Sequence, residues 1–259
     1  MPITLTRRDE FAVLTIDRPE ALNALSFGLI GEIEECLDQA AQSDARALLV
    51  TGAGQKAFCA GADIAELIGQ APQAHKRGVE FGQRVFSRVA ALPMPSVAII
   101  NGYAFGGGLE LALSCSFRLA TANARMGLPE IKLGLIPGYG GTQRLPRLIG
   151  EARALEMILT GRTVKADEAL QMGLVNRLLD GADGADPLDG GIAFAREFSC
   201  YSLASLRCAR EAVQRALQTT LAEGLKIEAD QSTLAYQSAD AAEGMAAFLA
   251  KRPANFTDK

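Results

Sequence analysis

Short apolar segments with the character of buried strands alternate with helical segments through the first two thirds of this 259-residue chain. A buried strand reads as a short apolar run bounded by turn residues, whereas a helix repeats its apolar residues every three or four positions. The expected strands are residues 11–16, 46–51, 96–101, 117–121 and 174–178, and the expected helices are residues 27–42, 79–92, 109–116, 151–160 and 165–172. Together the two patterns predict an α/β fold.

Beyond this alternation the pattern is almost purely helical, from residue 192 to residue 251. Residues 181–191 are rich in Gly and Asp and are predicted to form a surface loop at a boundary between domains 1–190 and 191–259. Asp240 and Glu243 have the spacing of a capping pair for the last helix. Residues 63–78 are mixed and polar, which predicts a mobile lid segment.

Composition narrows the classes of function. The chain is 49% hydrophobic with a net charge of −4 and a pI of about 5.2, so it offers no basic surface for nucleic acid or anionic lipid. It has no apolar run of membrane-spanning length. Residues 1–10 lack the apolar core of a secretory signal, so none is expected. Five cysteines without a CxxC motif predict reduced thiols and a cytoplasmic location. With a single histidine, His75, which is expected to be exposed, no metal site is predicted.

Two glutamates lie in apolar surroundings, twenty residues apart. Glu110 follows a glycine triplet in the segment GGGLELAL, and Glu130 lies in the segment GLPEIKL. A carboxylate in an apolar stretch must be paired, exposed or functional, because burial of an isolated charge is costly. The pair suggests acid–base chemistry at one reacting centre. Taken singly, Glu110 also fits a first-turn acid stabilised by a helix dipole, and Glu130 fits a charge on a surface loop.

Three glycine-containing segments surround these glutamates. Residues 106–108 lie between a strand and a helix, where free backbone N–H groups favour an anion. They lack the lysine of a P-loop, which favours a developing oxyanion over a nucleotide phosphate. Residues 58–63 offer another amide donor, although Asp63 is also the expected N-cap of the next helix. Residues 137–142 form a turn that can approach a small molecule. Taken alone, residues 106–108 are also explained by close packing or positive φ.

Taken together, the segments resemble the crotonase (enoyl-CoA hydratase/isomerase) superfamily over nearly the whole chain. The matching segments are residues 18–25 (RPEALNAL), 57–64 (AFCAGADI), 101–110 (NGYAFGGGLE), 128–138 (LPEIKLGLIPG), 140–145 (GGTQRL) and 243–252 (EGMAAFLAKR). The resemblance implies a spiral of β-β-α turns with a C-terminal helical region that builds trimers, commonly paired as hexamers. It also implies an acyl-CoA substrate, with coenzyme A as part of that substrate and no separate cofactor.

The resemblance assigns roles to individual residues. The oxyanion hole falls on the amides of Ala60 and Gly107, which would polarise the thioester carbonyl. Glu110 is expected to activate water and Glu130 to deliver a proton to Cα, and the amide of Gly138 is expected to help hold the acid or the water. The positions expected to line the CoA path are Ala21, Ala60, Ala62, Asp63 and Ile64.

Two retained acidic positions imply an enoyl-CoA hydratase, because hydration needs an activated water. A Δ3,Δ2-enoyl-CoA isomerase would need one glutamate, and other crotonase-type reactions would need side chains for which no signature is present. A non-catalytic, RNA-binding member is the alternative from another class, but its basic helix would have to be residues 205–215, which fit a solvated helix face better. Arg144 is expected to be a structural ion-pair partner.

Overall fold

The computed structural model describes residues 2–179 and 186–258. By its contacts the chain divides into two compact units. The first comprises residues 1–92 and 96–193, and the second comprises residues 93–95 and 194–259. The boundary predicted at residue 190 lies inside helix α8 (Pro187–Ser199), so the predicted loop 181–191 is wrong for residues 187–191. Its residues 181–185 lie outside the described part of the chain.

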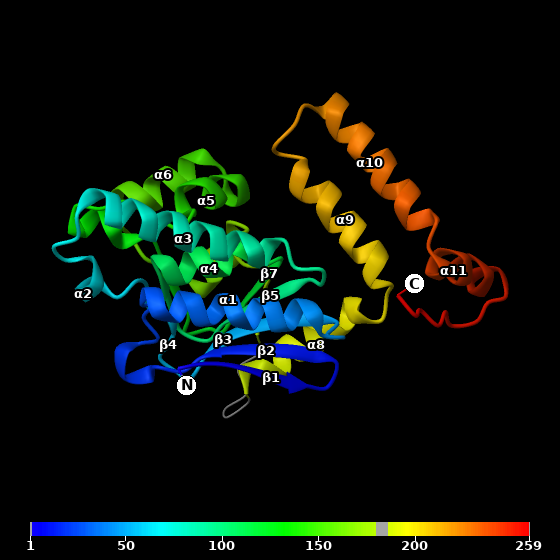
Figure 1. Cartoon of the computed structure of the whole chain (residues 1–259), viewed down its shortest axis with the longest axis horizontal. Coiled ribbons are helices and arrows are strands. Elements are labelled where there is room, and N and C mark those ends of the chain that lie inside the picture. The colour runs from blue at the N-terminus through cyan, green and yellow to red at the C-terminus, as the bar shows by residue number, and fades with distance from the viewer. Residues whose placement is uncertain (1, 180–185, 259) are drawn as a thin grey trace. The chain divides into compact units, whose positions relative to one another are not determined.

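Two sheets organise the first unit (Figure 1). The larger sheet has the order β1-β2-β3-β5-β7-β10, in which only β1 and β2 are antiparallel neighbours. The smaller sheet has the order β4-β6-β8-β9, with β9 antiparallel to β8. The strands of the larger sheet are β1 (Ile3–Arg8), β2 (Phe11–Ile16), β3 (Ala47–Gly52), β5 (Ser96–Ile100), β7 (Phe117–Ala120) and β10 (Arg177–Leu178). Those of the smaller sheet are β4 (Ala57–Cys59), β6 (Tyr103–Phe105), β8 (Arg125–Gly127) and β9 (Val164–Lys165).

The order of elements confirms the predicted spiral of β-β-α turns. Strands β3, β5 and β7 of the larger sheet are each followed directly by a short strand of the smaller sheet and then by one or more helices. Helices of this unit touch in succession, α1 with α3, α3 with α4, α4 with α5 and α5 with α6 (Figure 1). The helical elements of this unit are η1 (Pro19–Ala21), α1 (Phe27–Gln42), α2 (Ile64–Leu67), α3 (Pro72–Ala90), α4 (Gly107–Ser114), η2 (Pro129–Leu133), α5 (Gly141–Ile149), α6 (Glu151–Thr160) and α7 (Ala166–Gln171).

Local sequence explains the best-defined helix. Ser26 caps α1 by accepting a hydrogen bond from the amide of Leu29, and the apolar residues Ile30, Ile33 and Leu37 face the core. The predicted bounds of α1 are confirmed. Helix α3, in contrast, begins at Pro72 rather than at residue 79, because proline is favoured in the first turn of a helix. The segment predicted as a mobile lid therefore contains α2 and the first turns of α3.

The second unit is helical after α8, as predicted. Helices α9 (Leu203–Arg215) and α10 (Leu221–Tyr236) pack side by side and are followed by α11 (Ala239–Leu249) (Figure 1). Ser238, not Asp240, caps α11. The predicted capping pair is wrong because Asp240 is buried and accepts hydrogen bonds from the amides of Thr257 and Asp258. In the described residues, no helix has the length and apolarity needed to cross a membrane.

Candidate active site

Both glutamates line one cavity of the first unit, with a volume of about 870 Å³. Cavities of this size are typical of small-molecule sites. Its wall is contributed by the loop after β4, the start of α4, the exposed face of α3 and the stretch from η2 to the first turn of α5. The cavity thus brings together the three glycine-containing segments, which are spread over residues 58–142 of the sequence.

Glu110 lies in the first turn of α4 and is only 1% exposed. Its Oε1 atom accepts hydrogen bonds from the amides of Tyr139, at 2.8 Å, and Gly141, at 2.6 Å. Burial raises the pKa of Glu110 from an ordinary 4.5 to about 7; the charge of Glu130 adds to this rise, whereas the two amides and Arg144 oppose it. The carboxyl group can therefore exchange a proton near neutral pH.

Glu130 lies in η2 and is half-buried, so it is not a charge on a solvated loop. Burial raises its pKa above the ordinary value. Its Oε2 atom is buried and has no hydrogen-bond partner among the described residues. A buried carboxylate oxygen in this state is costly unless a ligand or water completes it.

Gly106 brings the backbone close to Glu130. A β-carbon at Gly106 would lie 2.9 Å from Oε1 of Glu130, and Gly106 has a φ of +50° that other residues rarely adopt. The glycine triplet therefore serves close approach as well as backbone conformation, and it places the second carboxyl group beside the start of α4.

The predicted oxyanion hole needs one correction. The amide of Ala60 donates to the carbonyl of Leu22 at 3.0 Å, which leaves it unable to bind an oxyanion. Gly107 is the first residue of α4, where backbone amides have no partner within the helix. The nitrogen of Ala62 lies 3.6 Å from a β-carbon built on Gly107, so these two amides are neighbours at the cavity wall.

Backbone pairing holds Ala62 in place. The amide of Leu25 donates to the carbonyl of Gly61 and the amide of Asp63 donates to the carbonyl of Leu25, both at 2.8 Å. These bonds fix the residues on both sides of Ala62 and leave its own amide out of the pairing. Within this segment the amide of Ala62, two residues after Ala60, is therefore the better candidate for the oxyanion hole, whose place stays a prediction.

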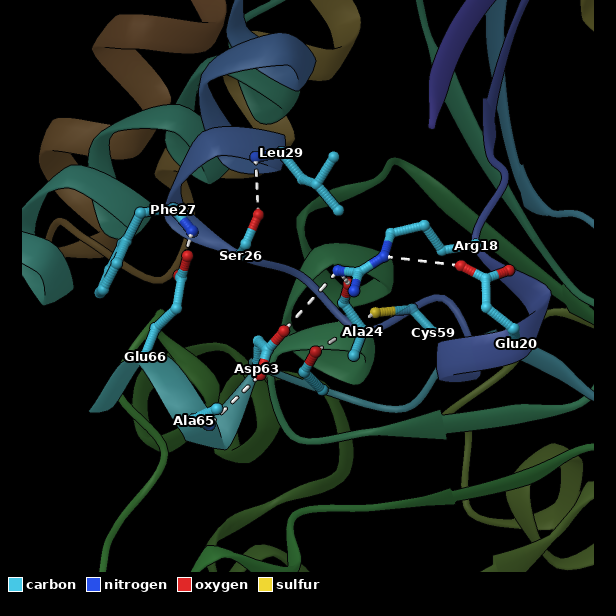
Figure 2. Close-up of polar contacts among 11 residues, drawn as sticks. Arg18, Glu20, Ala24, Ser26, Phe27, Leu29, Cys59, Asp63, Ala65 and Glu66 are labelled. Carbon is cyan, nitrogen blue, oxygen red and sulfur yellow. Dashed lines mark hydrogen bonds and ion pairs between the residues drawn. The ribbon is translucent and has the colours of Figure 1, made fainter. Parts of the chain in front are cut away.

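Of the residues predicted for the CoA path, Ala60, Ala62 and Ile64 line the cavity. Asp63 is the N-cap of α2, as its alternative explanation predicted, and lies 3.7 Å from Arg18 (Figure 2). Ala21 lies in η1, the short helix that follows Arg18. Figure 2 also shows Glu66 of α2 accepting from the amide of Phe27, at 2.7 Å. These contacts tie α2 and its N-cap to the first residue of α1 and to Arg18.

Gly138 lines the cavity, and its carbonyl accepts a hydrogen bond from Gln83 at 2.8 Å. The amides that hold Glu110 belong to Tyr139 and Gly141, which the sequence interpretation did not identify. Only the glycine-rich composition of residues 137–142 pointed to them. The water-positioning role of the Gly138 amide stays a prediction.

His75 is half-buried and lines the cavity, so the expectation that it is exposed is wrong. Among the described residues, no group of three or more His, Cys, Asp or Glu side chains could hold a metal ion.

Comparison with known proteins gives a consistent family. The profile of the family described as Enoyl-CoA hydratase/isomerase matches residues 6–259. A crotonyl-CoA hydratase of Syntrophomonas wolfei is 41% identical over 99% of this chain and 98% of its own length. A short-chain-enoyl-CoA hydratase of Clostridium acetobutylicum is 36% identical over 96% and 95%. The crystal structure of an enoyl-CoA hydratase from Bacillus anthracis covers all of both chains with a TM-score of 0.94 and 36% identity.

Proposed function

Because the chain belongs to the enoyl-CoA hydratase/isomerase family, we propose that it adds water across the double bond of a 2-enoyl-CoA thioester. One observation carries this proposal: the buried carboxyl group of Glu110 and the half-buried one of Glu130 share one cavity with a pair of neighbouring backbone amides. An isomerase needs only one of the two acids, whereas hydration uses both.

The amides of Ala62 and Gly107 polarise the thioester carbonyl. Negative charge moves onto the carbonyl oxygen as water attacks Cβ, and two preorganised N–H donors stabilise that charge. The dipole of α4, which begins at Gly107, acts in the same direction. Backbone donors need no side-chain rearrangement during the reaction.

The two glutamates handle the water and its protons. Glu110, with Oε1 fixed by two amides, takes a proton from the water as the water oxygen bonds to Cβ. The π electrons of the double bond move towards the carbonyl, and Glu130 then gives a proton to Cα. Proton return from Glu110 to Glu130 through the next water restores the site. Because the groups interact, their protons belong to the pair.

The CoA part of the substrate follows the loop after β4, past Ala62 and Ile64 at the cavity wall. Ala21 and Asp63, which the resemblance also assigns to this path, are not among the residues that line the cavity. The apolar side chains of the cavity, which include Phe27, Leu67 and Val79, suit an acyl chain. Coenzyme A enters as part of the substrate, and no further cofactor takes part. The cytoplasmic location stays a prediction.

A trimer, or a hexamer of paired trimers, is the proposed assembly. Large apolar side chains are exposed on the helices of the second unit, among them Leu221, Tyr236 and Phe248, at 80%, 68% and 83% exposure. Such surfaces favour association. A single-chain mass by light scattering at micromolar concentration would contradict this proposal.

Spectrophotometry with crotonyl-CoA tests the activity directly. The expected result is loss of the absorbance of the conjugated thioester, with a 3-hydroxyacyl-CoA product. A series of longer 2-enoyl-CoA substrates then gives the acyl preference. Rapid conversion of 3-enoyl-CoA to 2-enoyl-CoA without any hydration would refute the hydratase assignment and favour the isomerase.

A further inference from the structure

Arg144 lies behind the loop that holds Glu110. Its side chain leaves α5 and donates from Nη1 to the carbonyl of Tyr139, at 2.8 Å, and from Nη2 to the hydroxyl of Ser87 on α3, at 3.1 Å. The ion-pair role expected from the sequence is therefore wrong, because the acceptors of the guanidinium are a carbonyl and a hydroxyl. Burial lowers the pKa of Arg144, and the charge of the nearby Glu110 carboxylate opposes this effect.

The loop from Tyr139 to Gly141 contacts Glu110 through its backbone amides and Arg144 through its backbone carbonyls. Its amides at Tyr139 and Gly141 point to Oε1 of Glu110, and its carbonyls accept from Arg144. The carbonyl of Gly140 accepts from the backbone amide of Arg144, at 2.8 Å. Since this carbonyl and the amide of Gly141 belong to one peptide group, the hydrogen bonds form a chain that polarises towards Glu110.

The guanidinium of Arg144 lies against the backbone of this loop at Gly140. A β-carbon at Gly140 would lie 2.1 Å from Nη1 of Arg144, and the residue has a φ of +114°. The backbone conformation therefore requires glycine at this position, and a β-carbon would also displace the guanidinium from its contact with the loop. The support is a built contact and not a chance approach of a surface side chain.

The charges that face Glu110 are few. Glu130 on η2 raises the pKa of Glu110, and Arg144 on α5 lowers it. Burial raises the pKa of the Tyr139 hydroxyl to about 12, and that of the Cys115 thiol at the end of α4 to about 12, so both stay neutral.

Two further elements packed against α4 carry ionisable groups. Burial likewise raises the pKa of the Cys59 thiol on β4 to about 12, which keeps it neutral. Helix α3 contributes His75 and Lys76 to the wall of the same cavity, and Lys76 lies 3.6 Å from Glu80. Arg144 is the cation that is fixed directly on the loop carrying the two amides.

We propose that Arg144 is a positioning residue for Glu110, which fixes the two loop amides from behind and keeps the carboxyl group available as a base. The inference rests on the proposed hydration for its effect on turnover. The positioning itself concerns Glu110 and is measurable without substrate.

The test compares the wild type with Arg144→Met and Arg144→Lys, and uses Arg147→Met as the control. Arg147 is an exposed arginine of the same helix whose side chain contacts Gln143. Infrared titration of the carboxylic C=O band, assigned by its loss in Glu110→Gln, reports protonation of Glu110 directly. Loss of a nearby positive charge favours the protonated form, so in Arg144→Met the titration midpoint is expected to move up by at least about half a pH unit. The acid limb of the profile of kcat against pH should move up in pH together with this midpoint.

Arg144→Lys separates charge from geometry. The ammonium keeps the charge but cannot repeat the planar fork between carbonyl and hydroxyl. The midpoint is therefore expected to stay near that of the wild type while kcat falls by roughly 10-fold or more, with little change in KM, because misplacement of a catalytic group lowers turnover. Arg147→Met should change none of these quantities.

Superimposable titrations of wild type and folded Arg144→Met would overturn the proposal, as would an equal shift in Arg147→Met. If Arg144→Met does not fold, Ser87→Ala takes its place, because it removes one acceptor of the guanidinium and leaves the loop intact. The proposal would then be overturned if both Ser87→Ala and Arg144→Lys kept the wild-type titration of Glu110 and the wild-type kcat. A shifted midpoint in a protein that hydrates no enoyl-CoA would leave the positioning role standing and refute the proposed function instead.

Discussion

Replacement of the buried Glu110 by glutamine should stabilise the protein while it removes activity. The amide oxygen of glutamine can accept the same two hydrogen bonds as Oε1, from Tyr139 and Gly141, so the geometry is kept. The change removes the buried charge and puts an amide NH2 group in the place of Oε2. In the wild type, burial raises the pKa of this carboxyl group from 4.5 to about 7, so folding disfavours the ionised form.

The pH dependence follows from the sign of that shift. Below pH 4.5 the group is protonated in both the folded and the unfolded chain, and it contributes no penalty. Between pH 4.5 and 7 the unfolded chain ionises first, so the free energy of unfolding falls as pH rises, and above pH 7 the penalty is complete. At 1.36 kcal/mol per pKa unit, Glu110→Gln should gain about 3 kcal/mol at pH 8 and about 1 kcal/mol at pH 5.5.

Urea unfolding of both proteins at one fixed protein concentration, from pH 5.5 to pH 8.5, measures this difference. Glu151→Gln, a change at an exposed glutamate of α6, serves as the control and should show no comparable rise. A stability difference between Glu110→Gln and wild type that is flat over this pH range, or a variant less stable at pH 8, would refute the reasoning about burial.

Three other predictions concern catalysis, packing and metals. Glu110→Gln and Glu130→Gln should each slow hydration by roughly 10²-fold to 10⁴-fold. The double variant should be little slower than either single variant, because the two groups act as a unit. If steady-state kcat instead showed additive losses, the two groups would not share one step. Gly108→Ala should lower the melting temperature strongly, since its β-carbon would lie 2.1 Å from the carbonyl oxygen of Cys59, whereas Gly28→Ala in α1, with its nearest atom at 3.7 Å, should be tolerated; equal melting temperatures would contradict this. Treatment with a chelator should leave hydration unchanged, and restoration of lost activity by a divalent ion would show that a metal is required.

Long elements were predictable where cap and apolar spacing agree, as in α1, whereas α3 begins at Pro72 and not at the predicted residue 79. Helix α1 has a serine cap and regular apolar spacing, and its bounds were predicted correctly. Strands β4, β6 and β8 have three residues each, too few for any alternation to be visible, so the smaller sheet was missed. Their partners are distant in sequence, and only the assembled spiral brings them together.

The candidate site shows the same division. The sequence identified both glutamates and the segments that carry the amides, because these residue types are unusual where they occur. It could not show which amide of residues 60–62 is free, since this depends on the hydrogen bond from Ala60 to Leu22, nearly forty residues away. The support of Glu110 by Tyr139 and Arg144 likewise depends on how α5 meets α4.

The division of labour between backbone and side chains at the cavity has an evolutionary consequence. The amides that hold Glu110, and those proposed to bind the oxyanion, belong to the backbone, so a change of the Tyr139 or Ala62 side chain leaves them in place. Gly141 is more constrained, because a β-carbon there would lie 2.9 Å from a side-chain carbon of Leu128. The part of the cavity that we propose for the acyl chain is lined by replaceable side chains such as Phe27, Leu67 and Val79. Relatives of this chain can therefore diverge in the acyl groups they accept while the chemical step is inherited unchanged.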